Sequence, residues 1–204
     1  MNRLTPLKIL ILSLSLLINN TGMAEDNPWS TSYTLEAQGK YQEAITPLLP
    51  FINNEVKSEF AMLRIAWLNY LAKNYNESTA YYQNALALNA NSIDARLGLM
   101  LPLMAQSRWR EASFHGEQVL ATAPWQYYAH VRLLACEAAQ AQWEKVEKHA
   151  LQVSAHYPTD ADSLVFLARA QAKLNKSSEA KATYRKVLQM FPDHLEALKF
   201  LVSN

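Results

Sequence analysis

Histidine and cysteine are the side chains of this sequence with the most scope for chemistry. His149 follows His115 by one period of an internal repeat, and His156 follows His149 by two helical turns. Two imidazoles at such spacing could begin a metal site, but no carboxylate or third ligand has matching spacing, which favours solvated histidines on surface helices. Cys136 has no second thiol with which to form a disulfide, redox or zinc pair, and we expect it to be buried.

Signatures of catalysis are absent as well. The sequence contains no H-E-x-x-H metal motif, no Gly-rich phosphate loop and no G-x-S-x-G nucleophile turn. Acidic pairs such as Glu36 and Glu43 fall on different predicted helices and imply no cleft. The 19 basic and 18 acidic residues give no basic excess for nucleic acid. We therefore expect no enzyme activity, no cofactor, no metal and no nucleic-acid partner.

The composition favours helices. Half of the 204 residues are apolar and only four are glycine. Four glycines are few for a protein built from tight β-turns, so helices joined by short polar corners are the better fit. The single cysteine excludes a disulfide scaffold, and the near-zero net charge argues against a disordered chain.

The segment 1–24 has the layout of a secretory signal peptide. Arg3 and Lys8 precede an apolar run at 9–18, and the small residues Gly22 and Ala24 stand just before Glu25. The run is shorter than the ~20 residues that a membrane-spanning helix needs. We predict cleavage between Ala24 and Glu25 and a periplasmic or secreted mature chain without a membrane span, with retention of the segment as an anchor as the alternative.

The rest of the chain repeats at a fixed interval. Two series of residues recur at the same interval, which is the number of residues from Pro124 to Pro158. The prolines are Pro124, Pro158 and Pro192, and the aromatic residues are Tyr41, Tyr75, Trp109 and Trp143. Counting from Glu25 with this step gives five contiguous units and a tail: 25–58, 59–92, 93–126, 127–160, 161–194, and 195–204. A fixed period of this length is typical of an array of stacked supersecondary units.

These residues resemble the tetratricopeptide repeat, whose pattern is W-x2-L-G-x2-Y, A-x3-F, P. The last unit fills the slots of the pattern in order with Leu164, Leu167, Ala168, Ala180, Tyr184, Val187 and Pro192. The first unit is the weakest match, with Ser32 in the small slot and Val56 in the proline slot. The resemblance implies an all-α fold, a right-handed α-solenoid of five helix-turn-helix repeats plus a short C-terminal helix, with the first helix of each unit lining a concave face.

Two units depart from the pattern. Pro47 and Pro50 fall within the second helix of the first unit, where we expect a kink or a late start. Pro102 falls within the first helix of the third unit. Gly98, four residues earlier, is expected to leave room for a bent turn there.

The first helices carry more apolar side chains than one buried face requires. Within 59–73, Met62, Ile65 and Ala66 share one face, and the aromatic residues fall on the opposite face. Projecting this second face onto the neighbouring units predicts a partner-binding groove formed by Trp29, Tyr33, Phe60, Leu63, Trp67, Tyr70, Leu97, Leu101, Met104, Tyr128 and Val131. Asp162, Val165 and Arg169 continue the same face, so the groove should become more polar towards the C-terminus.

A groove with such aromatic anchors fits an apolar peptide or helix. We therefore predict a non-enzymatic adaptor or assembly factor that binds a protein partner in the cell envelope, with the bacterial setting implied by the resemblance. Three alternatives stay open: aromatic side chains that only fill seams between repeats, a sugar- or lipid-binding groove, and a structural spacer in a larger complex. Some family members grip a terminal carboxylate with lysines and asparagines, but the corresponding positions here are Trp29, Leu63, Leu97 and Val131.

The tail at 195–204 reads as the start of a sixth first helix. Leu198, Leu201 and Val202 fall on its packing slots. Since a second helix does not follow, Leu198, Phe200 and Leu201 are predicted to stay open and to support self-association, for example as a homodimer.

Overall fold

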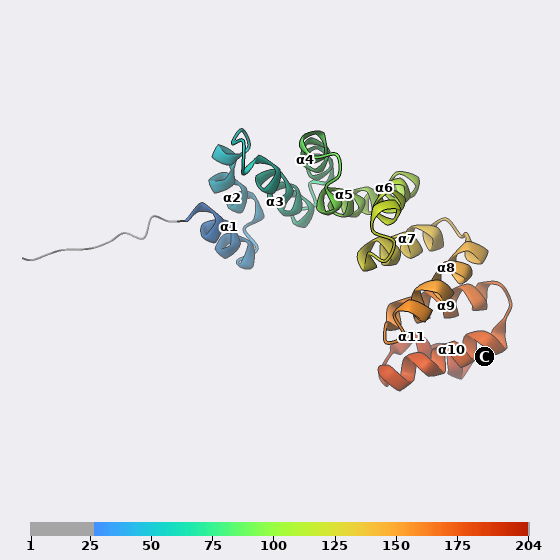
Figure 1. The fold of residues 1–204 in the computed structure, drawn as a ribbon. Helices are drawn as coiled ribbons and strands as arrows, with labels where there is room; N and C mark the ends of the chain where they lie inside the picture. Colours follow the sequence, from blue (N-terminus) through green and yellow to red (C-terminus); the bar gives the residue numbers. More distant parts are fainter. Residues whose placement is uncertain (1–26, 204) are drawn as a thin grey trace, which may run out of the picture.

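In a computed structural model, which describes residues 27–203, the helices follow one another along one curved array (Figure 1). The elements are α1 (Pro28–Ala37), α2 (Tyr41–Ile45), the 3-10 helix η1 (Thr46–Phe51), α3 (Ser58–Leu71), α4 (Tyr75–Leu88), α5 (Ile93–Ala105), α6 (Trp109–Thr122), α7 (Tyr127–Ala139), α8 (Trp143–His156), α9 (Ala161–Lys173), α10 (Ser177–Met190) and α11 (Leu195–Ser203). Between residues 27 and 203 there is no strand. The predicted all-α solenoid is confirmed, and each helix from α3 to α10 contacts both of its neighbours in the chain.

The second helix of every pair begins at the same position of the repeat. The helices α2, α4, α6, α8 and α10 start one repeat period apart, at Tyr41, Tyr75, Trp109, Trp143 and Ser177. Two positions earlier stands a residue with positive φ, and these residues are Gly39, Lys73, Ser107, Ala141 and Asn175. The next N–H closes the turn on the carbonyl five residues back, as Asn74 does on Asn69 at 2.8 Å. This closure is the Schellman motif, and it ends the first helix of each pair in the same way.

Side chains cap several of the first helices. The Ser92 hydroxyl accepts a hydrogen bond from the Ala95 N–H at the start of α5. The Asp160 carboxylate accepts from the N–H groups of Asp162 and Ser163 at the start of α9. Each cap satisfies backbone donors that the first turn of a helix leaves unpaired.

The hydrophobic core runs across the repeats. One cluster contains Ala66 of α3, Tyr82 of α4, Met100 of α5 and Cys136 of α7. A second cluster begins at Leu134 of α7 and continues to α11. Cys136 is fully buried, as predicted, and burial raises the pKa of its thiol to about 11. Since the clusters include several units each, a single repeat does not supply a complete core.

The first unit is irregular, as its prolines predict, but in a different way. The second helix starts at the expected position, Tyr41, but ends at Ile45, before the proline Pro50. The chain continues as the 3-10 helix η1, which contains Pro50. Proline lacks the N–H that an α-helix needs, so the shorter 3-10 turns replace α-helical turns here. Leu48 of η1 is still fully buried and completes the cluster formed with Ala44, Ile65 and Leu68.

Gly98 serves a purpose that its spacing from Pro102 does not indicate. Helix α5 continues through Pro102 to Ala105. A Cβ atom on Gly98 would lie 2.2 Å from Cε1 and 2.4 Å from Cζ of Tyr82, which is 4% exposed. The missing side chain therefore makes space for the Tyr82 ring, which crosses α5 from α4.

Replacing Gly98 with alanine tests this contact. In an ordinary helix the change stabilises by roughly 0.5–1 kcal/mol. Here we expect a loss of about 1–3 kcal/mol, because the methyl group overlaps a buried ring. Urea denaturation followed by circular dichroism measures the difference. A gain in stability would show that Tyr82 moves aside without cost.

The predicted signal peptide and its cleavage site between Ala24 and Glu25 lie outside the described residues. Within residues 27–203, no helix has the length and apolar character needed to cross a membrane.

Candidate functional site

The predicted groove residues come from helices on the inner side of the bend. Figure 1 shows α4 and α6 on the outer side and α5 and α7 further in. Tyr33 and Phe60 are each 50% exposed and Tyr128 is 57% exposed. The half-buried residues are Trp29, Leu63, Trp67, Tyr70, Leu101, Met104 and Val131. The prediction is wrong for Leu97, which is 7% exposed because its side chain packs with Met100 and Leu103 in the core.

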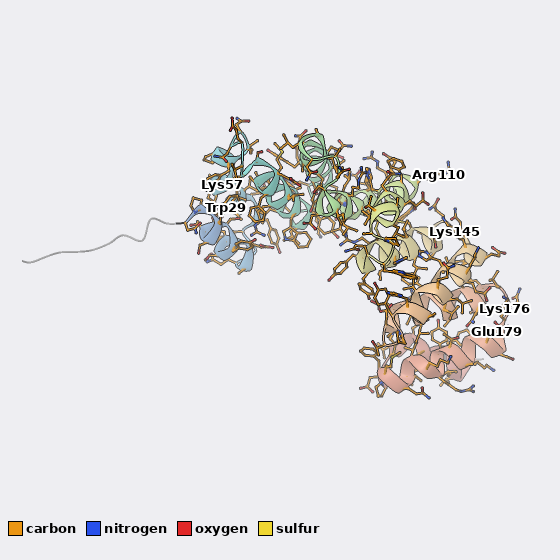
Figure 2. All side chains as sticks on the ribbon, viewed as in Figure 1. Trp29, Lys57, Arg110, Lys145, Lys176 and Glu179 are labelled. Atoms are coloured by element: carbon orange, nitrogen blue, oxygen red, sulfur yellow. The ribbon has the colours of Figure 1, made fainter. Side chains whose placement is uncertain are left out.

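Five aromatic residues of α1 and α3, which we call the aromatic patch, gather at the N-terminal end: Trp29, Tyr33, Phe60, Trp67 and Tyr70. The ring of Trp29 lies 4.9 Å from Phe60 and 5.0 Å from Phe51, centroid to centroid. Trp29 and Lys57 are both labelled at this end of the array in Figure 2, and Lys57 lies over the Phe51 ring. The rings of Trp67 and Tyr70 are 5.7 Å apart. The patch therefore combines half-exposed rings with rings wedged between helices, so part of its aromatic surface fills the seam.

An ion pair with a buried arginine lies at the centre of the patch. Arg64 is 7% exposed, its guanidinium lies 2.5 Å from the Glu36 carboxylate, and it stacks 3.8 Å from the Tyr33 ring centroid. The indole N–H of Trp67 donates to the same carboxylate at 2.7 Å. A charge-assisted network of this kind holds α1 and α3 in one arrangement.

Sequence reasoning missed this network. It treated Glu36 as a surface residue like Glu43, yet only Glu43 is exposed. The available signal was Arg64 itself, a charged residue between Leu63 and Ile65 in the apolar middle of the predicted helix. A charge in such a helix needs a buried partner.

A second ion pair lies at the C-terminal end of the array. Arg169 of α9 donates two hydrogen bonds to Glu196 of α11, at 2.7 and 2.5 Å, and the Tyr184 hydroxyl donates to the same carboxylate at 2.7 Å. The Arg169 guanidinium lowers the pKa of the Glu196 carboxyl. These bonds determine which side of α11 faces the array.

The tail packs differently from the prediction. With Glu196 anchored, Ala197 is fully buried and the Phe200 ring lies 4.9 Å from Tyr184. Phe200 and Leu201 are half-buried against the core, so they are not fully open surface. Leu198 is 39% and Val202 is 88% exposed, so neither residue occupies a packing slot.

The histidines are arranged differently from the expected solvated set. His149 contacts neither His115 nor His156. It bonds to His130 at 2.9 Å and to the Glu137 carboxylate at 3.0 Å, between α7 and α8. Glu137 is 2% exposed, and Lys145, labelled in Figure 2, lies 3.3 Å from its second oxygen. Within residues 27–203, no group of three or more His, Cys, Asp or Glu could hold a metal ion.

Donor counting explains how this chain of bonds works. The Pro124 carbonyl can only accept, so Nε2 of His130 donates to it at 2.9 Å. Neutral His130 then accepts at Nδ1, which requires Nε2 of His149 to donate. The Glu137 carboxylate accepts a hydrogen bond from Nδ1 of His149, so the bonds link Glu137 through His149 to His130 across α7 and α8.

Replacing Glu137 with glutamine tests whether this network stabilises the fold. Loss of the buried carboxylate removes the acceptor that bonds His149 and leaves Lys145 paired with Glu117 at 3.7 Å, so we expect a loss of about 1–3 kcal/mol. The matched control is Glu144→Gln on the exposed side of α8, expected to change stability by less than about 0.5 kcal/mol. Equal effects in urea denaturation would show that the network contributes nothing specific.

Two histidines should make the fold sensitive to acid. Burial lowers the pKa of His115, with Arg96 adding to the effect, and burial also lowers the pKa of His130 despite the Pro124 carbonyl. Both are depressed below the usual 6.5. Below that pH the unfolded chain binds more protons than the folded chain, so stability falls as the pH drops through about 6.5.

Denaturation midpoints measured at about pH 7.5 and about pH 5.5 bracket this window. His115→Leu should reduce the loss on the acid side, because Nδ1 of His115 is buried without a hydrogen-bond partner. A variant with the same pH dependence as the parent would contradict a contribution from His115.

Comparisons with known proteins identify the architecture. Residues 161–194 match the family model described as Tetratricopeptide repeat. No curated protein matches the chain. Residues 41 to the end of MamA from Desulfovibrio magneticus RS-1 form a similar structure, with a TM-score of 0.73 and 17% identity, covering 82% of this chain and 95% of that one.

Two further solved structures have the same fold. YrrB, described as a TPR protein with an unusual peptide-binding site, gives a TM-score of 0.70 at 15% identity, covering 84% of this chain and 89% of that one. PilW, a widely conserved type IV pilus biogenesis factor, gives a TM-score of 0.69 at 18% identity, covering 81% of this chain and 76% of that one. At these identities the likeness concerns the fold.

Proposed function

The chain has the tetratricopeptide-repeat fold, and from this premise we propose that it is a non-enzymatic adaptor or assembly factor that holds an apolar peptide or helix of a protein partner on the aromatic patch. A repeat solenoid of this type implies a protein-interaction or scaffold role. The more specific proposal concerns where the partner lies and what it presents.

The observation that carries it is the half-exposed pair Tyr33 and Phe60. They come from neighbouring inner helices, and each leaves half of its surface in solvent. Rigid aromatic side chains in such a position are typical anchors for a partner, since they lose little conformational freedom on binding. The Arg64–Glu36 pair holds Tyr33 in place before the partner arrives.

We further propose that the protein works in the bacterial cell envelope. The predicted signal peptide supports this location. PilW is a pilus biogenesis factor and YrrB has a peptide-binding site. Proteins with this fold therefore include one that acts in pilus biogenesis and one that binds peptides, as the proposal requires of this chain.

Site-specific photocrosslinking in the native cell tests the patch. A crosslinking residue at position 60 should capture a defined protein, while one at the exposed position 83 on α4 should not. Tyr33→Ser should weaken capture from position 60 by about tenfold or more, the effect of losing one aromatic anchor. Because Tyr33 is half exposed, we expect this variant to keep the parental helicity.

Tyr33→Ser is a better test than Trp67→Ala. Trp67→Ala would remove the N–H that donates a hydrogen bond to the half-buried Glu36, so a change in capture could come from lost binding or from lost stability. The same proteins captured from positions 60 and 83 would contradict the proposal. Native mass spectrometry of the purified chain completes the test, since a bound sugar or lipid in place of a protein would favour a small-molecule role.

A further inference from the structure

Three arginines reach across inner helices, and they differ in their partners. Arg64 pairs with Glu36, and Arg169 pairs with Glu196. Arg132 of α7 has no carboxylate partner among residues 27–203. One of its N–H groups donates to the backbone carbonyl of Leu97 on α5, at 2.5 Å. The middle of the inner face thus holds a guanidinium whose charge no acidic residue balances.

The repeat register shows why the counter-ion is missing. Arg132 stands two periods after Arg64, in the same slot of the repeat. Both arginines point back to the inner helix of the preceding repeat, α1 for Arg64 and α5 for Arg132. The slot that Glu36 fills on α1 is filled on α5 by Met104. The arginine is repeated along the array and its carboxylate is not.

The surroundings make this charge costly. Burial lowers the pKa of Arg132, and the hydroxyls of Tyr82 and Tyr70 offset part of that effect. The residue is half-buried, so its outer edge still reaches solvent. An incoming carboxylate would restore a bidentate pair of the kind that Arg169 already makes.

The neighbouring side chains indicate what accompanies the carboxylate. Tyr128, one turn earlier on α7, is 57% exposed, and its ring centroid lies 5.7 Å from the guanidinium. Leu101, Met104 and Val131 are half-buried nearby on the two helices. No lysine or asparagine stands among these residues. The Arg132 guanidinium is therefore the one cationic group here that can bind a carboxylate, and apolar surface lies beside it.

We propose that Arg132 binds an aspartate or glutamate side chain of the partner segment, while Tyr128 packs on an apolar residue next to it. An internal acidic residue fits better than a chain end, because inner helices continue on both sides of α7 and a bound segment can pass across it. This proposal rests on the proposed function, in which a protein segment lies along the inner face.

An array of short peptides tests the proposal with the full mature chain. All peptides have acetylated and amidated ends, apolar flanking residues, and glutamate, glutamine or lysine at the centre. The glutamate set should bind at least about tenfold better than the glutamine set, as expected for one charge-assisted pair. Arg132→Met should reduce binding of the glutamate set to the glutamine level and leave the glutamine set unchanged.

The matched control is Arg110→Met, which removes the same charge from an exposed site on the outer helix α6, labelled in Figure 2. It should keep the preference for glutamate. Arg132→Lys, which retains charge without the planar fork, should give an intermediate preference and provides a second variant if Arg132→Met fails to fold.

Several results would overturn the proposal. Equal binding of the glutamate and glutamine sets by the parent chain removes the role of Arg132 and leaves the proposed function intact. A preference that appears only in peptides with a free C-terminal carboxylate assigns the site to a chain end. If no set binds while the patch still captures a protein in cells, the acidic anchor is wrong; if capture fails as well, the proposed function fails with it.

Discussion

The structure depends on the packing of each helix against the helices before and after it. From α3 to α10, every helix contacts both of its neighbours in the chain, and first helices such as α3 and α5 also contact each other. The largest clusters span several repeats, so burial of apolar surface is complete only when the units stack. The inner face is consequently a product of the whole array.

Within that array, polar networks decide the local geometry. The aromatic end is organised around the Arg64–Glu36 pair and the C-terminal end around the Arg169–Glu196 pair. The bonds from Glu137 through His149 to His130 join α7 and α8. Ion pairs are a weak source of net stability, but these two join particular helices, α1 to α3 and α9 to α11. Arg132 lies between them in the array, without a carboxylate partner among residues 27–203.

The sequence was sufficient for features that recur with the period. The repeat step located the start of all five second helices, and the helical spacing of Met62, Ile65 and Ala66 correctly predicted their burial. Features that depend on two unlike residues meeting across repeats were not predictable in this way. Neither the insertion of Tyr82 over Gly98 nor the bond between His130 and His149 follows from any spacing rule, because their partners occupy different slots of the repeat. The orientation of α11 was wrong in the prediction for the same reason, since a single glutamate, Glu196, sets it.

The turns between the two helices of each pair have a residue in the left-handed conformation, whatever the side chain at that position. Gly39, Lys73, Ser107, Ala141 and Asn175 share a conformation that usually favours glycine or asparagine, although three of them are neither. The backbone hydrogen bonds that close each corner are the same in every repeat. The corner geometry is therefore set by backbone hydrogen bonds that do not depend on which residue stands there. Positions that carry no such backbone requirement differ between units, as in the slot that holds Glu36 in one unit and Met104 in another.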